Sequence, residues 1–529
     1  MYNKSSDGKY AMASAVPPLR IRTFVDAEID ESGDYMLYWM VANRRLEWNH
    51  ALDRALEVAR SLDKPLVVFE PLRIGYRWAA DRHHQMIIDG MAHHRARLDE
   101  VPVTYYPYVE PEEGAGKGLL EALASSACAV VTDDAPIFFL PKMLRAASGV
   151  VECRMEAVDS CGLLPLRAAT KGHSAAYHFR RFLHKTLPEH LGDFPEAEPL
   201  ADVELPELGG IPDEILDRWP PAHVELADDD FWGGDPTRVV PVEENGSDPT
   251  EARGPLLDLS GLSIDHDVGP TATRGGHGAA RRRLDEFLSE GLDRYAEHRN
   301  DPDADAASRL SPWLHYGHIS TYEVFDAVAE EEGWTPQKIS GPPDGRRKGW
   351  WGMSEAAESF IDELVMWREL GYGYCYHESD YESYESLPEW ARDTLEAHAD
   401  DEREHVYTLE ELASASTADE LWNAAQRQLV HEGVIHNYLR MLWGKNILAW
   451  TDHPREALEY MIELNNRYAL DGRDPNSYSG IFWVMGRFDR GWPEREVYGK
   501  VRTMTSRSTR KKVKLDRYLE RWGAQGSLL

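Results

Sequence analysis

The sequence predicts an α/β domain with a parallel, Rossmann-like sheet, followed by a large all-helical domain. Three observations lead to this fold class. Short apolar runs alternate with helical patterns near the start, a stretch rich in Pro, Gly and acidic residues follows, and helical periodicity dominates from residue 276 onward. At 529 residues the chain also exceeds the length at which one hydrophobic core keeps growing. We therefore expect domains at 20–180 and 276–529, joined by a linker at 181–275.

The first domain alternates strand and helix patterns. Apolar runs suited to strands cover residues 35–41, 65–72, 101–107, 127–133 and 150–158. Between them lie NHALDRALEVARSL, HHQMIIDGMAHHRARL and KGLLEALASS, in which apolar residues recur three and four positions apart. This alternation indicates a parallel sheet covered by helices. No GxGxxG follows the first strand, so the usual dinucleotide-binding fingerprint is missing.

The linker and the second domain differ sharply in composition. Residues 190–275 include DFPEAEPLADVELPELGGIP, which is typical of a surface linker with little secondary structure. Beyond it, helical periodicity is clear in five stretches, at residues 279–298, 321–332, 355–370, 418–451 and 454–468. The second domain is therefore expected to be all-helical.

Composition limits the class of protein. The formal net charge is −34, yet the segment 487–521 holds twelve Lys and Arg against five Asp and Glu. A basic face on an acidic body is compatible with DNA binding. No run of eighteen apolar residues and no signal-peptide pattern is present, so we expect a cytoplasmic protein without a membrane partner. The four cysteines form no CxxC pair, which argues against a structural metal site.

Two patterns in the helical domain allow a functional interpretation beside a structural one. Trp443 and Trp450 are seven residues apart and share a helix face, which fits either core packing or a path for electrons. SRLSPWLHYGHIS (308–320) contains Ser308 and Ser311 ahead of a helix start, which fits either simple capping or an anion site within reach of Arg299.

The stretch LNNRYALDGRDPNSYSGIFW (464–483) brings amides and carboxylates to a helix junction. Asn465 ends one helix, DGRDP forms a turn, and Asp474 followed by Pro475 begins the next helix. Capping accounts for Asp474 but leaves Asp471 unexplained. Several amide and carboxylate groups at one junction could hold a flat, hydrogen-bonding ring. GxSxG, Walker, HExxH and CxxC motifs are missing, so the sequence does not support a hydrolase, an NTPase or a metal-binding protein of these motif classes.

These motifs, with LVHEGVIHNYLRMLWGKNILAW and DRGWPEREVYGKVRTM, resemble the photolyase/cryptochrome superfamily, and within it the class II cyclobutane-pyrimidine-dimer photolyases. DYMLYWMVANRRLEWNHAL resembles the first strand and helix of that class, and the likeness covers about residues 20–180 and 276–520. The resemblance implies FAD in the helical domain, and UV-damaged double-stranded DNA as the partner of a monomeric repair enzyme. For the first domain it implies a light-harvesting pigment of the 8-hydroxydeazaflavin type, whose contacts the sequence does not identify.

The resemblance also implies roles for individual residues, by their positions in the family's motifs. Those matching the flavin site are Ser308, Leu310 and Ser311 at the FAD phosphates, Asn465 next to flavin N5 and Asp471 at the ring edge, with Arg299, Arg440 and Asp474 expected beside them. Those matching the substrate pocket are Glu363, which hydrogen-bonds the dimer's carbonyl, and Trp367, Met441 and Trp483, which form its apolar walls. Those matching the photoreducing tryptophan chain are Trp422, Trp443 and Trp450.

On the DNA side, Asp489 and Arg490 match an Asp-Arg pair in a DNA-facing loop, and Arg510, Lys511 and Lys512 belong to the basic segment expected to contact phosphates. Glu323 stands where the class carries an arginine that could pair with the loop's aspartate. Three alternatives stay open: a cryptochrome-like flavin photoreceptor without repair, a (6-4) photoproduct photolyase, and an inactive DNA-binding relic. Of these, the (6-4) reading would need a pocket histidine pair, which His431 and His436 supply poorly at a spacing of five.

Overall fold

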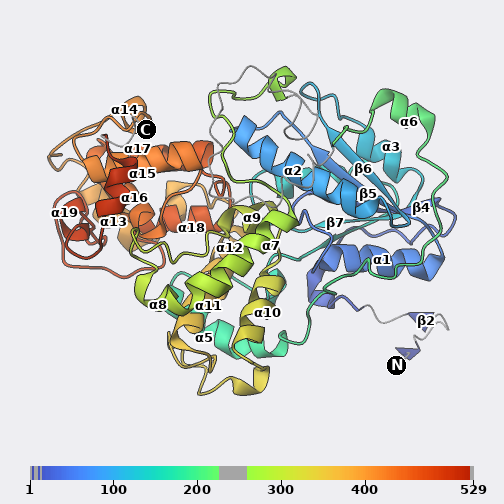
Figure 1. The fold of residues 1–529 in the computed structure, drawn as a ribbon, viewed down its shortest axis with the longest axis horizontal. Coiled ribbons are helices and arrows are strands. Elements are labelled where there is room, and N and C mark those ends of the chain that lie inside the picture. The colour runs from blue at the N-terminus through green and yellow to red at the C-terminus, as the bar shows by residue number, and fades with distance from the viewer. Residues whose placement is uncertain (1–2, 5–9, 12–14, 225–258, 525–529) are drawn as a thin grey trace.

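The computed structural model describes residues 3–4, 10–11, 15–224 and 259–524. An α/β part, drawn mainly in blue and cyan, and a helical part, drawn mainly in yellow-green to red, lie side by side (Figure 1). Residues 225–258 of the predicted linker lie outside the described residues. The domain boundaries themselves stay a prediction.

A six-stranded, mostly parallel sheet forms the centre of the α/β part, which confirms the predicted fold class. Its strands run in the order β3-β8-β7-β4-β5-β6, and β3 alone in this sheet pairs antiparallel with its neighbour. Their bounds are β3 Ile21–Val25, β4 Tyr35–Trp39, β5 Leu66–Leu72, β6 Val103–Val109, β7 Ala127–Asp133 and β8 Arg154–Val158. The sequence analysis missed β3 because this edge strand is partly exposed and lacks a continuous apolar run.

Helices cover both faces of this sheet. They are α1 His50–Leu62, α2 Asp81–Leu98, α3 Leu119–Ala124 and α4 Leu140–Ala147. Side chains alternate between the faces along each strand, so Leu37 packs in the cluster that contains α3 and α4, whereas Met36 packs in the cluster that contains α1. The side chain of Asn49 accepts a hydrogen bond from the Ala51 amide and thereby starts α1.

In the rest of the described chain the regular secondary structure is helical, and turns and loops connect the helices. Its α-helices are α5 Ala176–Thr186, α6 Asp213–Arg218, α7 His277–Glu286, α8 Tyr295–His298, α9 Ser311–Tyr316, α10 Thr321–Glu331, α11 Glu355–Ile361, α12 Arg368–His377, α13 Glu389–Ala397, α14 Leu409–Ala413, α15 Glu420–Glu432, α16 Asn437–Trp450, α17 Pro454–Tyr468, α18 Pro475–Val484, α19 Ser506–Thr509 and α20 Asp516–Trp522. Two π-helical turns are η7 Phe287–Gly291 and η10 Asp362–Trp367. The periodic stretch 418–451 forms two helices, because Gly433 adopts a φ of 68° and ends α15.

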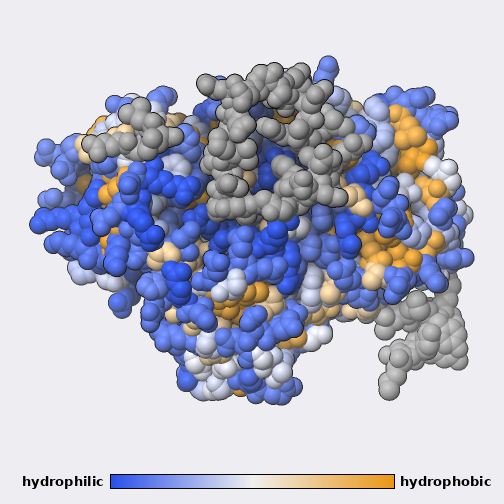
Figure 2. Space-filling view, in the orientation of Figure 1, coloured by the Kyte–Doolittle hydropathy of each residue, from blue (hydrophilic) through white to orange (hydrophobic). Residues whose placement is uncertain are grey.

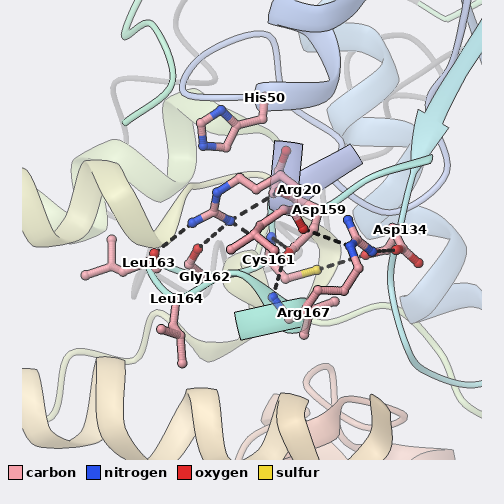
Figure 3. A network of polar contacts seen from close by, with 12 residues as sticks. Arg20, His50, Asp134, Asp159, Cys161, Gly162, Leu163, Leu164 and Arg167 are labelled. Carbon is pink, nitrogen blue, oxygen red and sulfur yellow. Dashed lines mark hydrogen bonds and ion pairs between the residues drawn. The ribbon is translucent and has the colours of Figure 1, made fainter. Parts of the chain in front are cut away.

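A buried arginine fixes the loop after β8, which lies against the helical part. Arg20 is fully buried, and its guanidinium donates hydrogen bonds to the carbonyl oxygens of Gly162 (3.1 Å) and Leu163 (2.7 Å), beside the Asp159 carboxylate (Figure 3). A Cβ on Gly162 would lie 2.3 Å from a carboxylate oxygen of Glu369 in α12, so only glycine allows this close approach. The loop after β8 is therefore held between the sheet and the helical part. In the described part of the chain, no helix combines the length and apolar character needed to cross a membrane.

Candidate functional site

A cavity of about 1380 Å³ opens in the helical part, between α9, η10 and α16 on one side and the α17–α18 junction on the other. This volume exceeds the range of about 300–1,000 Å³ of usual small-molecule sites, so the cavity has room for a large ligand. Fifteen residues singled out from the sequence line it, from six separate segments of the chain. They are Arg299, Ser308, Leu310, Ser311, Glu363, Trp367, Arg440, Met441, Trp443, Asn465, Asp471, Asp474, Trp483, Asp489 and Arg490.

The α17–α18 junction holds its polar groups in a fixed arrangement. As the sequence predicts, the Asp474 side chain caps α18, accepting a hydrogen bond from the Asn476 amide at 2.8 Å. The Asn465 amide donates to Ser477 Oγ at 3.1 Å, and that hydroxyl donates to the Asp471 carbonyl oxygen at 2.7 Å. The Asp474 carboxylate also lies 3.3 Å from His315, and bonds of this kind keep its pKa below the usual value.

Beside this junction, several buried polar atoms lack a hydrogen-bond partner among the described residues. Arg440 pairs with Asp471 at 2.8 Å, but its Nε remains without a partner. Both ring nitrogens of His436 also remain without one. Burial and then the nearby Arg309 lower the pKa of His436 to about 4, so the ring is neutral near pH 7. A buried, unpaired polar atom is costly, so this wall is suited to a large polar ligand.

Glu363 and Trp367 both lie on the π-helical turn η10, a distortion often found at functional sites. The Arg299 guanidinium, which the sequence places within reach of the Ser308–Ser311 segment, lines the same cavity and forms an ion pair with the Glu363 carboxylate. Burial raises the pKa of Glu363, and the Arg299 charge opposes this rise. The side chains of the pair are about 28% and 29% exposed, so both can reach a ligand in the cavity.

The Ser308–Ser311 segment leads into α9, which begins at Ser311 as expected, although the residue before it, Leu310, makes no side-chain cap. Arg283 fixes the segment by donating to the carbonyl oxygens of Ala307 (3.0 Å) and Ser308 (2.8 Å). Arg309 adopts a φ of 55° between the two serines. The segment is therefore held rigidly against the cavity.

Two cations flank the half-buried Trp483 ring. Arg502 lies 5.5 Å from the ring centroid and is bound to Asp489 at 2.7 Å. Asp489 in the DNA-facing loop therefore has an arginine partner, Arg502. The sequence analysis did not find this partner, because it expected the arginine at the position that Glu323 occupies. Lys445 is fully buried, with its Nζ 5.1 Å from the ring centroid and bonded to the Val484 carbonyl oxygen. Burial lowers the pKa of Lys445 to about 7.

Three tryptophans lead away from the cavity. Trp443 lines the wall, and its ring stacks on Trp422 with centroids 6.4 Å apart and an interplanar angle of 2°. Trp422, wholly buried, meets Trp450 edge to face at 5.7 Å. Tyr407, which the sequence analysis missed, packs on Trp450 at 5.5 Å. The aromatic series therefore runs from the cavity wall to the half-buried Tyr407.

The basic residues divide into two groups. Arg490 and Arg502 line the large cavity, as do Arg347 and Lys348, which the sequence analysis missed. The predicted contacts Arg510, Lys511 and Lys512 do not line it; they are exposed on the surface after α19. Hydrophilic side chains dominate the helical part on the face that Figure 2 shows.

A second cavity, of about 410 Å³, lies at the carboxyl edge of the parallel strands. Its lining is largely aromatic and apolar, including Trp39, Phe69, Tyr108, Phe138 and Phe139. This edge is where open α/β sheets bind ligands. Leu314, His315 and Asp474 line both cavities, so a single layer of side chains separates them at that point.

Comparison with known proteins gives full-length relatives. The deoxyribodipyrimidine photo-lyases of Methanothermobacter thermautotrophicus and Arabidopsis thaliana are 34% and 30% identical to this chain over 95% and 96% of its length, covering 97% and 93% of their own. A crystal structure of a bacterial class III photolyase from Agrobacterium tumefaciens matches with a TM-score of 0.61, over 93% of this chain and 86% of that chain, at 17% identity. This last likeness supports the fold. No protein-family model matches the chain.

Proposed function

The chain belongs to the photolyase family, and from this premise we propose that it repairs UV-damaged DNA by splitting cyclobutane pyrimidine dimers under blue light. Reduced FAD is the proposed cofactor and double-stranded DNA carrying a dimer the proposed substrate. The observation that carries the proposal is the large cavity, in which Glu363, three apolar walls and the first of a series of tryptophans meet.

The cavity wall fits a cofactor of FAD's chemistry. Arg440 Nε and the His436 ring nitrogens are buried polar atoms that a ligand would satisfy. The Arg440–Asp471 pair and the Asn465 amide would hold the flavin ring, and Ser308 and Ser311 would face the phosphates. The chemistry that bound reduced FAD supplies is light-driven donation of one electron, which returns after both cyclobutane bonds have broken.

The remaining wall residues would receive the dimer. A dimer must leave the base stack to be reached, and Trp367, Met441 and Trp483 offer half-buried apolar surfaces for it. Glu363, whose pKa burial raises, would donate a hydrogen bond to the dimer's carbonyl when protonated. Arg299 orients that carboxyl, while Arg490 and the exposed basic segment would contact phosphates around the flipped nucleotides.

The tryptophan series would restore the reduced cofactor. Neighbouring ring centroids lie 6.4 and 5.7 Å apart, so an electron could move in short steps from Trp450 through Trp422 to Trp443 at the cavity. The smaller cavity would hold the light-harvesting pigment, because its aromatic lining suits a flat ring system.

Repair of an oligonucleotide with a single thymine dimer, by the chemically reduced protein with and without blue light, tests the proposal. We expect light-dependent restoration of the two thymines. A protein that binds flavin but leaves the dimer intact would contradict the proposed dimer repair. The protein would then be assayed for photoreceptor activity and for repair of (6-4) photoproducts. A protein that binds no flavin would point to an inactive relic.

A further inference from the structure

A cluster of histidine and glutamate side chains lies away from both cavities, where the helical part meets the α/β part. Among the described residues, Glu47, His93 and His277 form a group in which one ligand atom from each lies within 4.8 Å of the others. Glu47 follows β4, His93 lies on α2 and His277 begins α7. Glu47 is buried and the two histidines are half-buried, so the group is enclosed on several sides.

The spacing within the cluster is close to that of a metal site. His277 Nδ1 lies 3.7 Å from a Glu47 carboxylate oxygen. Two ligands on a tetrahedral zinc ion, each at about 2.0–2.1 Å, stand about 3.3 Å apart. The His93 and His277 ring centroids are 6.1 Å apart. Two imidazoles and one carboxylate form a common ligand set for zinc, which leaves a fourth position for solvent.

The other nitrogen of His277 is already oriented. His277 Nε2 lies 3.0 Å from both carboxylate oxygens of Glu323, the residue at the position where the family resemblance leads us to expect arginine. An imidazole that binds a metal through one nitrogen usually donates its other N–H to a carboxylate. Glu323 therefore leaves His277 Nδ1 facing Glu47. Arg97 and Arg281 approach the carboxylate oxygens of Glu47 and Glu323, at 3.7 and 3.4 Å.

The backbone around His277 is adapted to a close approach. Gly275 and Gly276 precede it, and Gly276 has a φ of 89°. A Cβ on Gly275 would lie 2.0 Å from the Met86 carbonyl oxygen, and one on Gly276 would lie 3.3 Å from the His93 Cβ. The paired glycines therefore let the start of α7 lie directly against α2, which brings the two histidines together.

We propose that Glu47, His93 and His277 bind one Zn²⁺ ion, with Glu323 as the carboxylate that orients His277. The ion would join two residues of the α/β part to His277 at the start of α7 and would keep the open fourth position of a three-ligand site. The competing explanation is an ion-pair network in which a protonated His277 bridges Glu47 and Glu323 without metal.

The zinc content of the full-length, untagged protein tests the site. We expect one equivalent of zinc by elemental analysis after dialysis, and a tetrahedral cobalt absorption spectrum when Co²⁺ replaces it. The double variant His93→Gln/His277→Gln should bind none. His266→Gln is the matched control, because His266 also pairs with a carboxylate, Asp81, but lies outside the cluster. Wild-type protein without zinc, or a double variant with undiminished zinc, would overturn the proposal.

Two further measurements keep the test independent of how well the double variant folds. Calorimetric titration of Zn²⁺ into wild-type apoprotein should show one site, and failure to bind would overturn the proposal on its own. Glu323→Gln should keep that site but weaken it about 10–100-fold, as removal of an orienting carboxylate does. Unchanged zinc affinity in Glu323→Gln would contradict the orienting role. Dimer repair is not used as a readout, so failure of the proposed function leaves the test intact.

Discussion

The two cavities differ in the chemistry of their walls. The large cavity is lined by charged pairs and by buried polar atoms, such as Arg440 Nε, that find no partner in the described part of the chain. The small cavity is lined mainly by aromatic and apolar side chains at the edge of the sheet. Buried polar atoms without partners are costly, whereas an aromatic lining packs well by itself. The difference fits the proposed function, in which the large cavity takes part in polar, reactive chemistry and the small cavity holds a flat ring.

The cavities are also close neighbours. Leu314 and His315 on α9, with Asp474 at the start of α18, line both of them. The His315–Asp474 contact at 3.3 Å fixes this shared wall. Under the proposed function, a pigment in the small cavity would lie close to the cofactor in the large one. If the proposed roles are right, substitutions in the large cavity should alter the repair reaction. Substitutions in the small cavity should alter only the capture of light.

The largest expected effect is in the tryptophan series. Trp443→Phe should abolish photoreduction of the oxidised flavin, because it removes the ring that joins the cavity wall to Trp422. Absorbance of the flavin under blue light with an external reductant measures this. Repair by chemically reduced protein should persist. Trp350→Phe is the matched control, since Trp350 is equally buried but stacks on His184 outside the series. Photoreduction that survives in Trp443→Phe would place the electron path elsewhere.

Glu363 gives the next largest effect. Glu363→Ala should lower the rate of dimer repair about 10²–10³-fold, the usual cost of removing one hydrogen bond to developing negative charge in an active site. Bound flavin should be retained. Glu363→Gln keeps a donor and should retain more activity. Single-turnover repair after a light flash measures both variants. Release of flavin from Glu363→Ala would instead mean that the Arg299–Glu363 pair holds the cavity together.

The fold was largely predictable from the sequence, because five of the six strands of the large sheet are apolar runs and most long helices have clear periodicity. The edge strand β3 was missed for lack of it. The site was readable only in part. Asn465, Asp471 and Asp474 share one helix junction, so their proximity follows from chain order. The Arg299–Glu363 pair joins residues far apart in sequence and needed the three-dimensional packing. Lys445 was missed because a lysine in an apolar helix gives no sign of its complete burial.

The exposed basic segment should affect DNA affinity more than chemistry. A triple variant in which Arg510, Lys511 and Lys512 are each replaced by Gln should bind DNA with a weaker dependence on salt. The slope of log affinity against log salt should become shallower by up to about 0.9 for each phosphate that the protein no longer neutralises. Fluorescence anisotropy with a dimer-containing duplex between about 50 and 200 mM salt, the range in which binding to phosphates weakens strongly, measures the slope. Replacing Lys142 and Arg145, both on α4 and away from the large cavity, is the control and should leave the slope unchanged. An unchanged slope in the triple variant would place the phosphate-binding residues elsewhere.

Lys445, which lies against the Trp483 ring, should make the stability of the protein depend on pH. Its pKa is about 7 in the folded protein against 10.5 in the unfolded chain. Between these values the unfolded chain binds a proton that the folded protein does not, so stability rises with pH, by about 1.4 kcal/mol per pH unit from this group. Below pH 7 both states are protonated and the full penalty remains. Urea titrations at several pH values measure the unfolding free energies of wild type and Lys445→Met. The difference between these two free energies should change with pH by that slope. A difference that stays constant with pH would contradict the shifted pKa.

The smallest effect is expected in the small cavity, and it is the sharpest test of the comparison. Leu120 lines only this cavity, so Leu120→Trp should fill the space and exclude the pigment. Pigment absorbance should disappear from protein reconstituted with an 8-hydroxydeazaflavin, and repair should slow only under dim light of the wavelengths that the pigment absorbs. Under saturating light the rate should equal that of Leu120→Met, which conserves the volume. A lower rate under saturating light would mean that the small cavity also shapes the reactive one, through the wall of Leu314, His315 and Asp474 that they share.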